Sequence, residues 1–107
     1  MFFKKKEVDL NKVNAFCEWF VENQENIVNS FMSGDEAAMM KSLDEVELQL
    51  SYVYRDGYKK RIEFEYGNPS DGQWELNLYH MNNKFLIRAT DEIAKVLNEK
   101  LQGKWLV

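Results

Sequence analysis

The chain has 107 residues, a length that fits one domain and leaves no room for a second core. Hydrophobic residues make up 45% and charged residues 30%, which is the composition of a globular protein and excludes a disordered chain. The net charge of −4 argues against nonspecific nucleic-acid binding, because that activity needs a basic surface.

The compartment is predicted from the cysteine count and from the lack of long apolar runs. The only cysteine, Cys17, cannot form an internal disulfide, which favours a reducing compartment. Residues 1–6 are typical of the charged start of a signal peptide, but no apolar region follows them. Apolar runs are also too short for a transmembrane helix. We therefore expect a cytoplasmic protein with no membrane partner.

Apolar residues recur at helical spacing as far as Arg55-Asp56-Gly57. Asp9 is a candidate cap for a first helix that runs to about Met32. The apolar stripe of this helix contains Leu10, Val13, Phe16, Cys17, Phe20, Ile27 and Phe31. Trp19 and Val21 flank the stripe, so the middle of the helix is apolar over a wide arc and is either deeply buried or in contact with something besides its own core.

A second helix is predicted after Ser33, which has capping-box spacing to Glu36. Its core face contains Met39, Met40, Leu43, Val46, Leu50 and Tyr54. Leu48 and Tyr52 lie roughly opposite that face and form an apolar pair where solvent is expected. With Trp19, this pair is a candidate self-association surface. The alternative is that Phe2-Phe3 or the tail at 105–107 covers one of these positions.

After residue 57 the pattern changes to the alternation of β-strands. Residues 60–66 alternate, residues 67–72 are rich in turn formers, and a second strand places Trp74, Leu76, Leu78 and His80 on one face. Asn82-Asn83 suits a two-residue hairpin loop. The resulting third strand pairs His80 with Phe85, Leu78 with Ile87 and Leu76 with Ala89.

A last helix is predicted to begin at Thr90 or Asp91 and to end near Gly103, with Ile93, Val96, Leu97 and Leu101 as its stripe. Residues 104–107 then form a short strand or a docked tail. The sequence thus predicts a single α+β domain over residues 1–107. Two N-terminal helices pack on one face of a three- to four-stranded antiparallel meander, and a C-terminal helix closes the fold.

The outer face of the predicted sheet carries several carboxylates. Tyr66 and Trp74 share the inner face if the hairpin core is continuous. A seven-residue loop then places Glu65 opposite Glu75, and a five-residue loop places Glu63 opposite Glu75. The side chains expected on the outer face are Arg61, Glu63, Glu65, Glu75, Tyr79 and Arg88. The functional interpretation is an acidic platform for a basic partner, and the alternative is an ordinary solvated face.

Few residues in the sequence indicate chemistry. His80, the only histidine, is expected on the inner sheet face beside Phe85, and Cys17 lies in an apolar stripe. One cysteine and one histidine far apart do not make a zinc site. The basic runs Lys4–Lys6 and Lys59–Arg61 are interpreted as solubilising or edge-protecting clusters. We therefore expect no catalytic residue, no metal, no cofactor and no small-molecule substrate.

The stretch Phe16-Cys17-Glu18-Trp19-Phe20-Val21-Glu22-Asn23 is followed by a second helix, an Ile62–Tyr66 strand and a late Gly103-Lys104-Trp105. This order resembles small uncharacterised bacterial α+β proteins that have an aromatic-rich first helix, a β-meander, a helix and a C-terminal tryptophan strand. The resemblance spans most of the chain. It implies a bacterial cytoplasmic protein and assigns no activity.

Three classes of function follow from these observations. The first is a non-enzymatic protein-interaction module, for example an immunity or inhibitor protein that covers a basic toxin such as a nuclease. The second is a homo-oligomeric structural or scaffold protein that self-associates, as a homodimer, through Trp19 or the Leu48/Tyr52 pair. An enzyme that uses His80 or the carboxylates ranks third, because it would need a deep pocket joining them.

Overall fold

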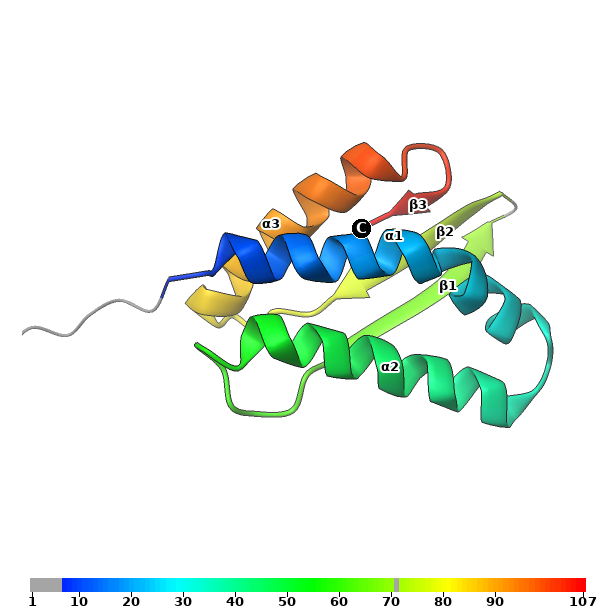
Figure 1. The fold of residues 1–107 in the computed structure, drawn as a ribbon, viewed down its shortest axis with the longest axis horizontal. Coiled ribbons are helices and arrows are strands. Elements are labelled where there is room, and N and C mark those ends of the chain that lie inside the picture. Colours follow the sequence, from blue (N-terminus) through cyan, green and yellow to red (C-terminus); the bar gives the residue numbers. More distant parts are fainter. Residues whose placement is uncertain (1–6, 71) are drawn as a thin grey trace, which may run out of the picture.

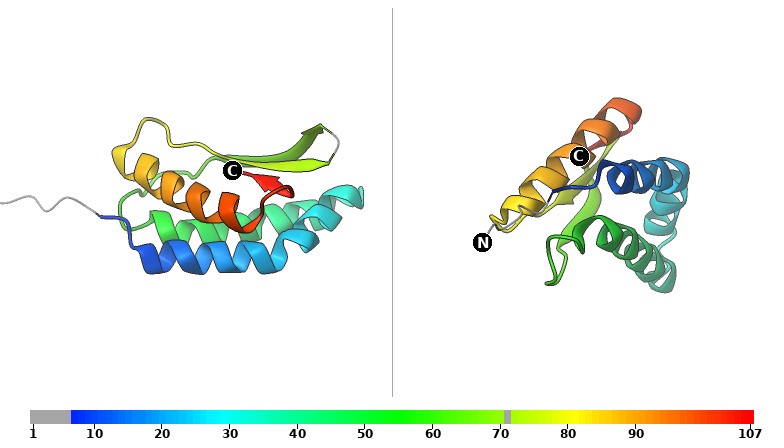
Figure 2. Two further views of the ribbon diagram at one scale, coloured as in Figure 1. Left: turned by 90° about the horizontal axis from the view of Figure 1, so that it is seen from above. Right: turned by 60° about the vertical axis from the view of Figure 1, so that its left-hand side comes forward.

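The computed structural model of the chain describes residues 7–70 and 72–107, and it contains three helices and a three-stranded sheet (Figure 1). In chain order the elements are α1 (Leu10–Met32), α2 (Glu36–Tyr54), β1 (Phe64–Ser70), β2 (Gln73–Leu78), α3 (Lys84–Lys100) and β3 (Trp105–Leu106). The helices lie on the same side of the sheet, as the view from above makes plain (Figure 2). The predicted α+β class is confirmed, but the arrangement of the strands differs from the prediction.

Helix α1 begins where the sequence predicted. The Asp9 carboxylate accepts hydrogen bonds from the backbone N–H groups of Asn11 and Lys12, at 2.9 and 3.4 Å. The buried residues of α1 are Val13, Phe16, Cys17, Phe20 and Ile27. Leu10 and Phe31, predicted for the same stripe, are exposed because they lie near the two ends of the helix, beyond its most closely packed part.

The connection between α1 and α2 corrects the predicted cap. Ser33 ends α1 instead of starting α2, since its backbone N–H donates to the Asn29 carbonyl. Gly34 follows with φ +72°, a left-handed conformation that glycine adopts without steric cost after a helix. Asp35 then caps α2, and its carboxylate accepts from the N–H groups of Ala37 and Ala38. The stronger carboxylate acceptor thus lies nearer the new helix than the predicted serine.

Strands β1 and β2 form an antiparallel hairpin whose register matches neither predicted loop length. Gly67 lies opposite Glu75, and Glu65 lies opposite Asn77. The strands continue into the residues predicted as a loop, with an irregularity between Gly67 and Ser70. This register places no carboxylate directly opposite another, which removes the repulsion that both predicted registers contained.

The predicted third strand is wrong, because residues 84–100 form one helix, α3. Asn83 is its N-cap, and its side-chain oxygen accepts from the Leu86 N–H at 3.1 Å. Thr90 and Asp91, the candidate caps of the predicted last helix, lie inside α3. Asn82 does adopt the positive φ expected of it, but this turn leads into a helix and not into a hairpin.

The last strand, β3, pairs with β2 in parallel, with Trp105 beside Trp74. The sheet order is β1-β2-β3, so the sheet is mixed and not the antiparallel meander that the sequence predicted. A helical crossover returns the chain to the starting end of the preceding strand, which produces a parallel pair. Helix α3 is that crossover.

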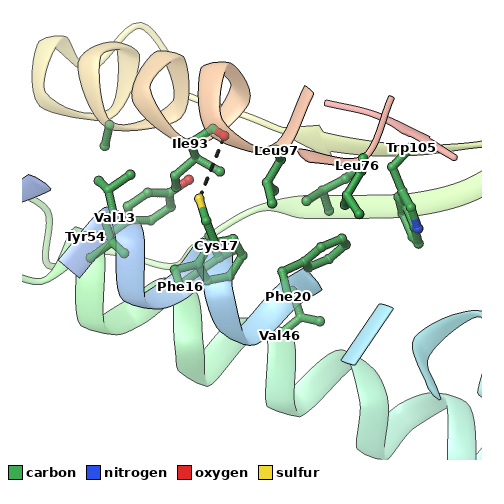
Figure 3. Packing of buried hydrophobic residues seen from close by; sticks show 14 of the residues in the cluster. Val13, Phe16, Cys17, Phe20, Val46, Tyr54, Leu76, Ile93, Leu97 and Trp105 are labelled. Carbon is green, nitrogen blue, oxygen red and sulfur yellow. Dashed lines mark hydrogen bonds between the residues drawn. The ribbon is translucent and has the colours of Figure 1, made fainter. Parts of the chain in front are cut away.

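The core lies between the helices and the inner face of the sheet (Figure 3). Trp105 is central to it, with its ring 5.0 Å from Phe20 and 5.7 Å from Trp74, centroid to centroid. Tyr66 and Trp74 share this inner face, as predicted. Met40, which the sequence placed on the core face of α2, is instead 52% exposed.

Candidate protein-binding face

Helices α1, α2 and α3 all pack on the inner face of the sheet (Figure 2). No helix among residues 7–70 and 72–107 covers the opposite face. Its side chains alternate with the buried residues of β1 and β2, and a last one comes from β3. We name this surface the open face, and it comprises Glu63, Glu65, Glu75, Asn77, Tyr79 and Leu106. The sequence therefore correctly predicted that Glu63, Glu65, Glu75 and Tyr79 share a face.

One hydrogen bond on the open face links the two strands of the hairpin. The Tyr79 hydroxyl donates to the Glu65 carboxylate at 2.5 Å. The pKa of Tyr79 lies above its ordinary value of 10.0. The largest cause is this hydrogen bond, followed by desolvation and by the negative charges of Glu65 and Glu63. Tyr79 therefore stays protonated at neutral pH and keeps donating, and its ring remains 44% exposed.

A shallow hollow of about 360 Å³ lies over the middle of the open face, between the carboxylates of Glu65 and Glu75. Gly67 lines it, and no heavy atom of the described residues outside 66–68 lies within 4 Å of the position that a Cβ would occupy there. The two carboxylates thus flank bare backbone, where the backbone or side chain of a partner can approach closely.

A second hollow of about 440 Å³ lies between α2 and the start of β1. Its apolar lining includes Met40 and Leu43 from α2, together with Ile62 and Phe64. The charged and polar residues that line it are Asp44, Glu47, Arg61, Glu63 and Tyr79. Since Glu63 and Tyr79 belong to both surfaces, this hollow continues the open face around the edge of the sheet.

Arg88 does not belong to the open face, contrary to the sequence prediction. It lies on α3, where it lines a separate hollow with Asp91, Glu92 and Lys95. The error follows directly from the assignment of residues 84–89 to a strand. Arg61, the other expected cation, precedes β1 and lines the hollow beside α2 together with Glu63.

The other predicted surface is divided between Trp19, which is partly buried on α1, and the exposed pair Leu48 and Tyr52 on α2. Trp19 comes seven residues after Lys12, so the two lie on the same side of α1. The Lys12 ammonium pairs at 2.6 Å with Asp56, which lies just after α2, so this side of α1 faces α2. Leu48 is 51% exposed and Tyr52 is 40% exposed, on the flank of α2 opposite Leu43. The Arg55 guanidinium lies 5.1 Å from the centre of the Tyr52 ring.

Of the groups that could support catalysis, His80 and Asp91 line one hollow of about 290 Å³, and Cys17 lies outside it. His80 is exposed instead of lying on the inner sheet face, and its Nδ1 accepts from the Asn82 N–H. Cys17 is fully buried, and burial raises the pKa of its thiol to about 12 (Figure 3). Among the described residues, no three histidine, cysteine or acidic side chains form a group able to hold a metal ion.

Sequence reasoning missed several residues of the candidate surface. Asp44, Glu47 and Leu43 join it only because α2 lies beside the edge of β1, and the order of elements along the chain gives no sign of that contact. Leu106 joins it through the parallel pairing with Glu75. The predicted basic run Lys4–Lys6 and the proposed cover by Phe2-Phe3 lie outside the described residues.

Comparison with protein-family models, curated proteins and solved structures finds no match to this chain. The resemblance to small bacterial α+β proteins therefore remains a prediction. None of the helices that the structure describes is long and apolar enough to cross a membrane.

Proposed function

We propose that this chain is a non-enzymatic protein-binding module and that its binding site is the open face. The observation that carries the proposal is the one-sided cover of the sheet, with three carboxylates and an exposed tyrosine on the uncovered side. A buried, unreactive Cys17 suits the reducing cytoplasm that we propose as its compartment.

The charge of the open face favours a basic protein as the partner. Glu63, Glu65 and Glu75 are solvent-accessible, and no cation of the described residues pairs with any of them. Such a field increases the rate of encounter with a basic protein and contributes to specificity. Tyr79 adds an amphipathic ring of the kind that dominates binding energy at protein interfaces. An immunity or inhibitor protein that covers a basic toxin is the specific form of this function that we favour.

The test is a pull-down from a lysate of the source organism with three forms of the chain. The first is wild type, and the second carries Glu63→Lys, Glu65→Lys and Glu75→Lys. The third is a control with the same change in charge on exposed helix positions, Glu18→Lys, Glu22→Lys and Glu99→Lys. All three must first show the same helical circular dichroism and a cooperative unfolding transition.

We expect a basic protein to be captured by wild type and by the helix control, and to be lost with the sheet variant. Its capture should weaken as salt rises from about 0.05 to about 0.5 M, because the attraction between exposed charges is screened. Equal capture by all three forms would refute the proposal.

A second candidate function is self-association through the Leu48/Tyr52 pair on α2, favoured by the exposure of both side chains. It predicts a dimer in sedimentation experiments that the change Leu48→Lys converts to a monomer. A monomer at all concentrations would exclude it.

A further inference from the structure

Strand β1 has a free edge. It is the first strand of the order β1-β2-β3, so it has one neighbour within the described sheet. The Tyr79 N–H donates to the Glu63 carbonyl at 3.2 Å, which places the backbone groups of residues 63, 65 and 67 toward β2. The N–H and C=O groups of Phe64 and Tyr66 therefore point away from the sheet, and none of them bonds to another described residue.

This edge lacks most of the features that protect such strands. Natural proteins protect free edges with charged side chains, prolines, bulges, very short strands or a covering helix, and here α2 lies beside the edge without a backbone hydrogen bond to it among the described residues. In β1 the proline and the irregular register lie at its far end, beyond Gly67. The stretch from Phe64 to Gly67 pairs regularly with β2, so its outer side offers an ordered template for one more strand.

The surroundings of the edge define the chemistry of the strand that would fit. A strand added at about 4.8 Å from β1 would turn alternate side chains to the two faces of the sheet. On the inner side they would meet the apolar lining of the second hollow, including Met40, Leu43 and Phe64. On the outer side they would lie beside the carboxylates of Glu63 and Glu65, which carry no salt bridge to a described residue.

We infer that the free edge of β1 is a strand-addition site for an extended segment of a partner protein in which basic and apolar residues alternate. This inference rests on the proposed function and specifies how its partner is held. A second copy of this chain fits the edge less well, because pairing β1 with β1 would bring Glu63 and Glu65 of both copies onto one face.

The probe for the test is a synthetic peptide of about ten residues, the usual upper length of a strand, with strictly alternating lysine and valine. The control peptide has the same composition, with its lysines and valines in two separate blocks. Amide hydrogen exchange is measured by NMR on the ¹⁵N-labelled full chain, alone and with each peptide in excess.

We expect the alternating peptide to slow exchange at Phe64 and Tyr66 by about tenfold or more, because new backbone hydrogen bonds protect these amides. The amides of Glu65 and Gly67, already bonded to β2, should change little, and the block peptide should protect neither edge amide.

Three results would overturn the inference. The first is the absence of peptide binding, and the second is binding that leaves the Phe64 and Tyr66 amides unprotected, as expected for attraction between charges alone. The third is protection of these amides that grows with protein concentration in the absence of peptide, which would assign the edge to a second copy. If any of these occurs while the sheet variant still loses its basic partner in the pull-down, the proposed function stands and the strand-addition site does not.

Discussion

Tyr79 and Glu65 form the one hydrogen bond between side chains of the open face, and their titration reports on it directly. The carboxylate favours the neutral phenol, so the pKa of Tyr79 lies above that of the unfolded chain. Because the pKa is raised, the pair contributes its full stability at pH values below the ordinary tyrosine pKa of 10.0. This contribution is lost as the pH rises from there through the raised pKa of the folded chain. The change Glu65→Gln should lower the pKa of Tyr79 toward its ordinary value, as measured by NMR titration. An unchanged pKa would show that the bond does not form in solution.

Tyr54 has a buried hydroxyl group that bonds to no described residue, and burial raises the pKa of this group. A buried polar group without a partner loses its hydration without compensation. We therefore expect Tyr54→Phe to leave the free energy of unfolding unchanged or to raise it by about 1 kcal/mol in urea denaturation. Tyr66→Phe is the comparison, since it removes a hydroxyl that bonds to Ser42 at 3.4 Å. A loss above about 1 kcal/mol for Tyr54→Phe would reveal an unrecognised partner.

Gly57 is fixed by its contact with Phe85. A Cβ at this position would lie 2.3 Å from the phenyl ring, closer than any van der Waals contact allows. We predict that Gly57→Ala lowers the free energy of unfolding by about 1–3 kcal/mol, the usual effect of overpacking. The matched control is Gly67→Ala, where the space for a Cβ is open. Equal stability of the two variants would mean that the loop after α2 does not pack on α3 as described.

Helix α3 depends on the N-cap at Asn83. Loss of its side-chain acceptor should cost about 1 kcal/mol of stability, the typical effect of an N-cap removal. The experiment compares Asn83→Ala with Asn14→Ala, an exposed position inside α1, by thermal unfolding. If residues 84–89 were a strand, as the sequence pattern suggested, no helix would begin at Asn83. The change Asn83→Ala would then leave the helical circular dichroism unchanged.

The helices α1 and α2 could be predicted because their apolar spacing is unambiguous. Residues 85–89 could not, because they satisfy two patterns at once. Phe85, Ile87 and Ala89 alternate as in a strand, while Phe85, Leu86, Ala89, Ile93 and Leu97 follow the period of a helix, and these five are buried. Packing against α1 and the loop at Gly57 decides between the two, and that contact is not local in sequence.

The candidate site was predictable only in part. Alternation along two strands was sufficient to place Glu63, Glu65, Glu75 and Tyr79 on one face, because the side-chain period is independent of register. Register itself was not predictable, since it depends on an irregularity near Ser70. The hollow beside α2 required the position of a helix relative to a strand edge, which only tertiary packing determines.

The fold confines the hydrophobic core to one side of the sheet, and the binding site that we propose lies on the other side. The helices, the inner sheet face and Trp105 form a continuous core on one side of the sheet. The other side contributes little to that core, so its side chains are free to serve another purpose. We propose that this purpose is to bind a basic protein.

Carbodiimide labelling of carboxylates, read by mass spectrometry, tests this proposal on the chain alone and in complex with its captured partner. We predict that labelling of Glu63, Glu65 and Glu75 falls by about tenfold or more in the complex, because tight contact excludes the reagent together with water. Labelling of Glu18, Glu22 and Glu99 on the helices should stay unchanged. The reverse pattern, with helix carboxylates protected and sheet carboxylates still labelled, would contradict binding through the open face.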